Sequence, residues 1–201
     1  MQLNPSEMRG RDVYRLMTSV LVPRPVAWVG SRSPEGIDNL APFSYFMGVG
    51  SRPPLIAFSV ARADRLGTLK DTARNVLARQ ELTVSIASEE HLNVLHASGA
   101  RFPPEVSEIE ALGLTSVPGE IVSAPRVGEA PIGMECRLER ALDLEQAHLF
   151  LVEVLRFHVA DRLLTPDGVV DEIALRPIVR LGPSGYASLG NLLVPDPVEA
   201  G

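Results

Sequence analysis

The chain has 201 residues, of which 45% are hydrophobic and 22% are charged. These fractions are typical of a folded globular protein and exclude a disordered chain. Nineteen lysines and arginines stand against 25 aspartates and glutamates, which gives a formal net charge of −6. An acidic chain lacks the electrostatic footprint for nucleic acid or an anionic membrane surface, so we expect neither as a partner.

The single cysteine, Cys136, excludes an internal disulfide and a cysteine-cluster metal site, and we expect it to be buried as a small hydrophobe. The first residues show no basic segment followed by an apolar core, and no apolar run is long enough to cross a bilayer. Prolines and glycines are spread along the chain without a linker. We therefore expect one cytoplasmic domain over residues 1–201, without a bound metal.

The first third of the chain predicts a short helix followed by strands. Ser6 is the expected N-cap of the helix, and the Val22–Pro25 segment ends it. The elements expected here are a helix over 6–17 and strands over 26–31, 38–48 and 55–60. Turn residues at 33–36 predict that the first two strands pair as a hairpin. Pro42 cannot donate a ladder hydrogen bond, so it indicates an edge, a bulge or a break in its strand.

Residues 68–79 give the clearest helical pattern. Apolar residues recur there at helical spacing, namely Leu69, Ala73, Val76 and Leu77. Thr68 is the expected N-cap, with Asp71 three residues later as in a capping box. We therefore expect the helix to begin at Thr68.

The remainder predicts further strands and one more helix. The expected elements are strands over 82–87, 132–142, 148–160 and 173–181, a helix over 88–97 and a surface excursion over 98–130. Short connections predict a largely antiparallel sheet, and the lack of regular strand–helix alternation argues against a doubly wound fold. A mainly β barrel with helices at its rim fits best, because closure removes exposed edges.

Cationic residues surround the predicted helix start. Arg62, Arg65 and Lys70 lie near it, together with the hydroxyls of Thr68 and Thr72. Free N–H groups at a helix start and nearby cations suit a phosphate. An ordinary capped helix with a nearby lysine has the same residues, and the residues alone favour that alternative.

The segment Asn39–Phe46 combines Pro42 with small polar groups that can face a ligand. An irregular strand whose aromatic residues fill the core is the alternative that the residues alone favour. His91 and His96 are five positions apart, so they do not form a helical metal pair. The sequence contains no nucleophile-elbow motif and no glycine-rich phosphate loop.

Six segments occur in an order that resembles one family. They are Arg24–Val29, Asn39–Phe46, Arg52–Val60, Lys70–Val76 and, late in the chain, His148–Val154 followed by Arg176–Gly182 with Tyr186. The chain resembles the flavin reductase-like family of FMN-binding split-barrel proteins, especially the flavoredoxin-like branch. The resemblance covers about residues 20–190. It implies a six-stranded antiparallel split barrel of Greek-key type with flanking helices, a homodimer, and FMN near the dimer interface.

The resemblance also implies a set of cofactor-binding residues. They are Trp28, Ser31, Asn39, Ala41, Pro42, Phe43, Ser44, Ser59, Val60, Arg65, Thr68, Lys70, Thr72 and Tyr186. Among these, Arg65, Thr68, Lys70 and Thr72 would hold the phosphate. We expect no catalytic side chain, because hydride transfer to a flavin needs no protein acid or base.

The implied activity is FMN-dependent oxidoreduction, in which NADH or NADPH gives a hydride to flavin N5 and an unknown acceptor takes the electrons. Two alternatives remain: an electron-transfer flavoprotein that a partner protein reduces, and a flavin-free split-barrel binding protein. Gln146-Ala147 replaces the family's Gly-Asp before His148, and Leu66-Gly67-Thr68 replaces its common histidine. We therefore assign no role to His148 and leave the nicotinamide site open.

Overall fold

The computed structural model describes residues 1–64 and 66–195, so the predicted phosphate ligand Arg65 lies outside the described residues. The strands of this part are β1 (Arg24–Pro25), β2 (Ala27–Arg32), β3 (Asp38–Phe43), β4 (Phe46–Ser51), β5 (Pro54–Ala61), β6 (Glu81–Ile86), β7 (Ser116–Val117), β8 (Arg126–Val127), β9 (Ile132–Asp143), β10 (Ala147–Val159), β11 (Val179–Leu181) and β12 (Gly185–Ala187). The α-helices are α1 (Gly10–Val20), α2 (Asp71–Arg79), α3 (Leu92–Ala97), α4 (Glu108–Ala111) and α5 (Glu172–Leu175). Three short 3₁₀ helices cover Pro5–Glu7, Glu89–His91 and Asp161–Leu163.

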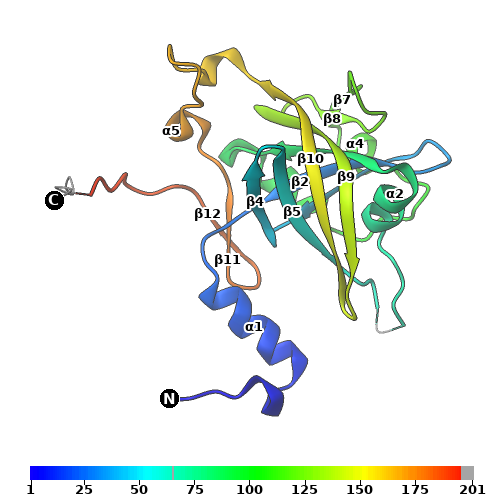
Figure 1. The fold of residues 1–201 in the computed structure, drawn as a ribbon, viewed down its shortest axis with the longest axis vertical. Coiled ribbons are helices and arrows are strands. Elements are labelled where there is room, and N and C mark those ends of the chain that lie inside the picture. Colours follow the sequence, from blue (N-terminus) through cyan, green and yellow to red (C-terminus); the bar gives the residue numbers. More distant parts are fainter. Residues whose placement is uncertain (65, 196–201) are drawn as a thin grey trace.

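The main sheet curls into a barrel that is not closed. Within the described chain its seven strands run in the order β3-β2-β6-β9-β10-β5-β4, and all their pairings are antiparallel. The edge strands β3 and β4 are joined only by Ser44 and Tyr45. Figure 1 shows β4 beside β5 at one edge of the sheet. The predicted mainly β, antiparallel split barrel is therefore confirmed, with its split beside this two-residue link.

The single strand predicted over 38–48 is wrong, because the chain changes partners inside it. Residues up to Phe43 pair with β2, whereas residues from Phe46 pair with β5. The one predicted strand is therefore two strands, β3 and β4, at the two edges of the main sheet. The main sheet thus has seven strands, whereas the resemblance implies six. Pro42 lies on edge strand β3, as expected for a residue that cannot donate to a ladder.

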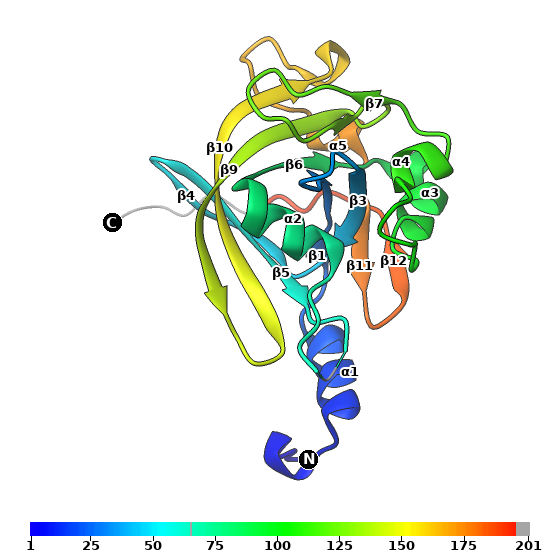
Figure 2. The ribbon, with the colours of Figure 1, turned by 90° about the vertical axis from the view of Figure 1, so that its right-hand side faces the viewer.

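The interior of the barrel holds the larger core, which α2 covers (Figure 2). Ala73 and Val76 of α2 are buried there against Val29, Phe58 and other apolar strand residues. Cys136 is also fully buried in this core, as expected. The helix ends at Gln80, which takes a left-handed conformation and donates its backbone N–H to Val76 O.

A second core lies on the outer face of β2 and β3, under α3 and α4. Trp28 is fully buried there with Leu40, Leu95 and Ile109. Ala27 and Val29 of β2 therefore face the barrel core and Trp28 faces the outer core, which explains why the first half of this strand is apolar. The Trp28 indole N–H donates to Ser98 Oγ at 2.9 Å and so fixes the end of α3.

The amino-terminal helix begins later than the sequence predicts. Ser6 is not its cap: Ser6 lies in a 3₁₀ turn whose cap is Asn4, and Arg9 occupies the cap position of the α-helix. The α-helix then runs from Gly10 to Val20, which replaces the predicted 6–17. Figures 1 and 2 show α1 standing away from the barrel as an arm, and Tyr14, Met17 and Val20 are exposed on it.

The segment over 98–130, predicted to be a surface excursion, is attached to the barrel by Glu135 of β9. The carboxylate of Glu135 is fully buried. Its oxygens accept backbone N–H groups of Glu120, Ile121 and Val122 at 2.6–3.0 Å, and Oε1 lies 2.6 Å from His158 Nε2. Burial acts to raise the pKa of Glu135, but these donors outweigh it and lower the pKa to about 2. A buried carboxylate therefore anchors the excursion.

The last predicted strand, over 173–181, is wrong in its first half. Asp171 caps a helical turn there by accepting the N–H groups of Ile173 and Ala174, and Arg176 ends it in a left-handed conformation. Only Val179–Leu181 forms a strand, which joins β1 and β12 in a small sheet. Among the helices of the described residues, none is long and apolar enough to cross a membrane.

Candidate functional site

A cavity of about 590 Å³ opens beside the split of the barrel. Its walls come from edge strand β3 with the link that follows it, from β5 and the β9–β10 turn, and from α1, the loop before α2, the end of α3 and the β11–β12 hairpin. Six of the predicted cofactor residues line it: Pro42, Phe43, Ser44, Ser59, Lys70 and Tyr186. In Figure 2 the arm α1 lies below the barrel, with the β11–β12 hairpin beside it.

The charged lining of this cavity is entirely basic. Lys70, His96 and Arg180 face it, whereas no aspartate or glutamate within residues 1–64 and 66–195 does. None of the three forms an ion pair with a carboxylate of the described residues. An unpaired basic cavity in a chain of net charge −6 is suited to an anionic ligand.

Lys70 occupies the cap position of α2, because the helix begins at Asp71 and not at the predicted Thr68. The Asp64 carboxylate explains the shift: it accepts the backbone N–H groups of Leu66 and Thr68 and closes a loop there. Thr68 is therefore an exposed loop residue, not a cap. Burial among protein atoms and, secondarily, the charge of Arg101 lower the pKa of Lys70, although the residue keeps contact with solvent.

A buried polar cluster supports the start of α2. Asn39 donates to Thr72 Oγ1 at 3.0 Å and to Ser31 Oγ at 3.2 Å, and Asn75 donates to the same serine oxygen at 3.2 Å. Asn75 Oδ1 has no hydrogen-bond partner among the described residues. Three predicted ligands, Ser31, Asn39 and Thr72, thus tie β2 and β3 to α2 and do not line the cavity.

Three further predicted residues also lie outside the cavity lining. Trp28 belongs to the outer core, Val60 is buried in the barrel core, and Ala41 packs against that core. The cofactor contacts predicted for them remain predictions.

The sequence did not single out Arg24 as part of the site, although it opens a segment that carries the resemblance. Its buried guanidinium donates to Thr18 O and Leu21 O at the end of α1, and to Gly182 O of the β11–β12 loop, at 2.6–2.8 Å. Its Nε lies 3.4 Å from Ser44 Oγ at the split. One side chain therefore holds three walls of the cavity together.

His96 and Arg180 are two lining residues with basic side chains that the sequence did not identify. Both contact Tyr186: His96 Nδ1 lies 3.2 Å from its hydroxyl, and the guanidinium carbon of Arg180 lies 4.4 Å from its ring centroid. The three residues come from α3, β11 and β12, so no local sequence motif predicts that they lie together.

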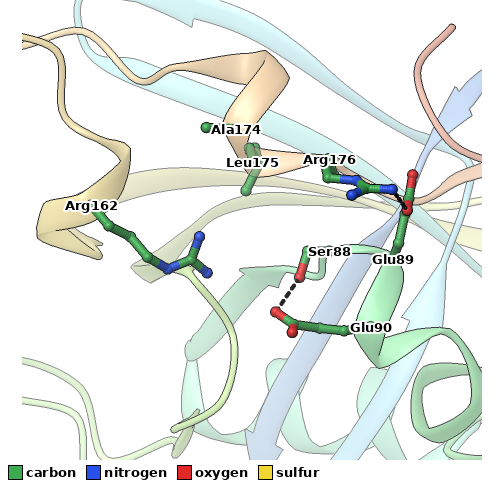
Figure 3. A pocket seen from close by; sticks show the side chains of 7 residues that line it. All are labelled: Ser88, Glu89, Glu90, Arg162, Ala174, Leu175 and Arg176. Carbon is green, nitrogen blue, oxygen red and sulfur yellow. Dashed lines mark hydrogen bonds and ion pairs between the residues drawn. The ribbon is translucent and has the colours of Figure 1, made fainter.

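A second hollow, of about 620 Å³, is charge-balanced and therefore less suited to an anion. Arg162 and Arg176 line it together with Glu89 and Glu90. Figure 3 shows Arg176 directed to Glu89, with which it forms an ion pair, and Glu90 accepting the hydroxyl of Ser88 at 2.9 Å. We therefore take the basic cavity as the candidate site.

Comparisons with known proteins agree with the fold. The model of the flavin reductase like domain matches residues 17–174. The chain belongs to this flavin reductase-like family. The predicted family resemblance is thereby confirmed, and flavin-related redox activity is the activity that membership supports.

Three solved structures illustrate the similarity. Nitrilotriacetate monooxygenase component B from Bacillus cereus is 41% identical, with 96% of this chain and 98% of that chain covered and a TM-score of 0.93. The 2-nitrobenzoate 2-nitroreductase of Pseudomonas fluorescens is 28% identical, with 100% and 99% covered and a TM-score of 0.87. Flavoredoxin of Desulfovibrio vulgaris is 26% identical, with 98% and 97% covered and a TM-score of 0.80.

Proposed function

We propose that this flavin reductase-like protein binds FMN in the basic cavity and uses it for NAD(P)H-dependent reduction of a flavin or another acceptor. The observation that carries the proposal is the unpaired Lys70 at the cap of α2, in a cavity that has cationic and apolar but no acidic side chains. The nitroreductase and the monooxygenase component among its structural relatives support a redox role.

The chemistry of the lining fits FMN. Pro42, Phe43 and Tyr45 provide an apolar wall for an aromatic ring system, while the hydroxyls of Ser44 and Ser59 can hydrogen-bond its polar atoms. Lys70 is placed to pair with the phosphate. Both influences that lower the pKa of Lys70, burial and the Arg101 charge, would be offset by an anion beside it.

When bound, FMN supplies hydride acceptance from NADH or NADPH and onward electron transfer to the acceptor. The chain's own part is to bind and orient. Thr72, held by Asn39, fixes the first turn of α2 and so the position of Lys70. Arg24 holds Ser44 and the end of α1 in place. No lining side chain has to move a proton for hydride transfer.

Two other functions are distinguished by experiment. An electron-transfer flavoprotein without a nicotinamide site is favoured by the similarity to a flavoredoxin. A flavin-free split-barrel binding protein would use the same cavity for another anion.

The first experiment is to purify the protein, add FMN, remove the excess by desalting, and record the absorption spectrum before and after NADH or NADPH. Retained flavin bands that bleach with a nicotinamide support the proposal. Retained bands that do not bleach support the electron carrier. A colourless protein supports the flavin-free alternative and overturns the proposal.

A titration of the protein with FMN tests whether Lys70 binds the phosphate. Lys70→Gln should weaken FMN binding by about 1.5–3 kcal/mol, the range for hydrogen bonds to charged groups. Arg74→Gln is the matched control, because Arg74 lies one turn further along α2, is exposed and pairs with Asp71. An unchanged dissociation constant for Lys70→Gln would refute the placement of the phosphate.

We also propose that the protein is a homodimer. An apolar hollow of about 560 Å³, lined by Leu21, Met47, Val49, Leu142 and other apolar residues, adjoins the cavity and shares Ser44, Tyr45 and Ser59 with it. Met47 is 60% exposed there, as expected for a surface that a second copy covers. Sedimentation at micromolar concentration should give twice the mass of one chain; the mass of a single chain would contradict the proposal.

A further inference from the structure

The basic cavity carries a second cationic centre besides Lys70. Arg180 faces it from β11, and its Nη2 donates to Pro183 O at 2.7 Å while its guanidinium lies over the ring of Tyr186. Arg180 has no carboxylate partner among the ion pairs of the described chain. Its backbone and aromatic contacts therefore fix its position but leave its charge unneutralised.

His96 completes this centre from the other side of Tyr186. Its ring meets the tyrosine ring edge-on, with centroids 5.7 Å apart, and its Nδ1 lies 3.2 Å from the phenol oxygen. Tyr186 is thus held between a guanidinium on its face and an imidazole at its hydroxyl. The guanidinium of Arg180 and the hydrogen-bonded pair of Tyr186 and His96 supply hydrogen-bond donors to one side of the cavity.

This centre is distinct from the one at Lys70. Lys70 comes from the loop before α2, whereas Arg180 and Tyr186 come from the small sheet of β1, β11 and β12. FMN carries a single phosphate group, so one flavin placed with its phosphate at Lys70 leaves the charge of Arg180 without a counterion.

We infer that Arg180, Tyr186 and His96 bind the anionic oxygen group, a carboxylate or a phosphate, of a second ligand that enters the cavity beside the flavin. A planar guanidinium suits bidentate contact with either group. The carboxylate would belong to a small organic acceptor and the phosphate to a nicotinamide dinucleotide. The inference rests on the proposed function only in assigning the flavin phosphate to Lys70.

The test uses the full-length protein without added flavin, with benzoate and inorganic pyrophosphate as separate probes in isothermal titration calorimetry. Neutral benzamide is the control ligand. We expect one anion to bind and benzamide not to bind. Arg180→Gln should weaken anion binding about ten- to hundred-fold, the equivalent of losing a charged hydrogen bond. Arg162→Gln, which alters an arginine of the charge-balanced hollow, should leave it unchanged.

A second pair of variants separates this inference from the proposed function. Lys70→Gln should weaken FMN binding but retain binding of the preferred anion, whereas Arg180→Gln should do the reverse. If FMN fails to bind the wild type while the anion still binds through Arg180, the proposed function fails and the anion site stands. Tighter binding of benzoate supports an acidic acceptor, and tighter binding of pyrophosphate supports a dinucleotide.

His96→Gln guards against misfolding of the Arg180 variant, because His96 is exposed on α3. It should weaken the binding of the same anion several-fold without changing the circular dichroism spectrum. The inference is overturned if neither anion binds the wild type, or if anion binding persists unchanged in Arg180→Gln or in His96→Gln.

Discussion

Glu135→Gln should lower the free energy of unfolding by about 2–5 kcal/mol, at about 1–3 kcal/mol for each buried donor left without an acceptor. The amide keeps the shape of the carboxylate but carries two donors on one arm. In the wild type, Oε1 of Glu135 accepts from Glu120 N and contacts His158, and Oε2 accepts from Ile121 N and Val122 N. Whichever way the amide turns, its N–H₂ group must face buried donors, so at least one is left without an acceptor.

The loss of unfolding free energy in Glu135→Gln should be largest at neutral pH and smaller in acid. The folded pKa of Glu135, about 2, lies below its ordinary value of 4.5. A depressed carboxyl pKa stabilises the fold fully above about pH 4.5 and progressively less as the pH falls toward 2. Urea unfolding of both proteins should therefore show a large gap at pH 7 that narrows between pH 4.5 and 2.

Glu139→Gln is the matched control, because Glu139 is exposed on the same strand β9. It should change the unfolding free energy by less than about 0.5 kcal/mol. A wild-type-like midpoint for Glu135→Gln at pH 7 would mean that the excursion does not depend on this carboxylate.

Arg24→Lys should loosen the walls of the cavity while keeping the charge. A lysine ammonium cannot reproduce the fork by which Arg24 reaches Thr18 O, Leu21 O and Gly182 O. We expect a loss of about 2–4 kcal/mol in unfolding free energy, at about 1–3 kcal/mol for each buried group left unpaired. Limited trypsin digestion should also cleave α1 faster, at Arg11 or Arg15, because the end of that helix loses its anchor.

Arg137→Lys provides the comparison for Arg24→Lys, since Arg137 forms a surface pair with Glu153 on β9 and β10. Surface pairs contribute about 0–1 kcal/mol, so this variant should retain wild-type stability and digestion. Equal digestion rates for Arg24→Lys and the wild type would show that α1 is held by other contacts.

Local sequence rules predicted the strands and the hairpin of β2 and β3 well, because burial and alternation act over a few residues. They misplaced element ends where a distant or polar side chain decides the backbone. Asp64 closes the loop that moves the start of α2 from Thr68 to Asp71. Asp171 caps a helical turn inside the predicted last strand, and the change of partner at Ser44 depends on the curl of the whole sheet.

The site was predicted in part for the same reason. Lys70 and the segment around Pro42 have local signals, a helix start and an irregular strand, and they do line one cavity. His96 and Arg24 have no such signal, because their partners Tyr186 and Gly182 lie far along the chain. Arg180 contacts Pro183 and Tyr186 nearby in sequence, but only the fold shows that it faces the cavity. A positive charge in a sequence does not show whether a carboxylate neutralises it in the fold, and that is the property on which the anion sites depend.

The two-residue link between β3 and β4 has a consequence for how relatives of this protein can diverge. Ser44 and Tyr45 span the opening between both margins of the sheet, and both residues line the cavity. An insertion between Ser44 and Tyr45 would move the edge strands β3 and β4 apart and widen the split of the barrel. Insertions into the long surface segment before β9 would leave the split unchanged. The width of the split therefore depends on the number of residues between β3 and β4. Substitution of the lining side chains can change ligand specificity without changing this width.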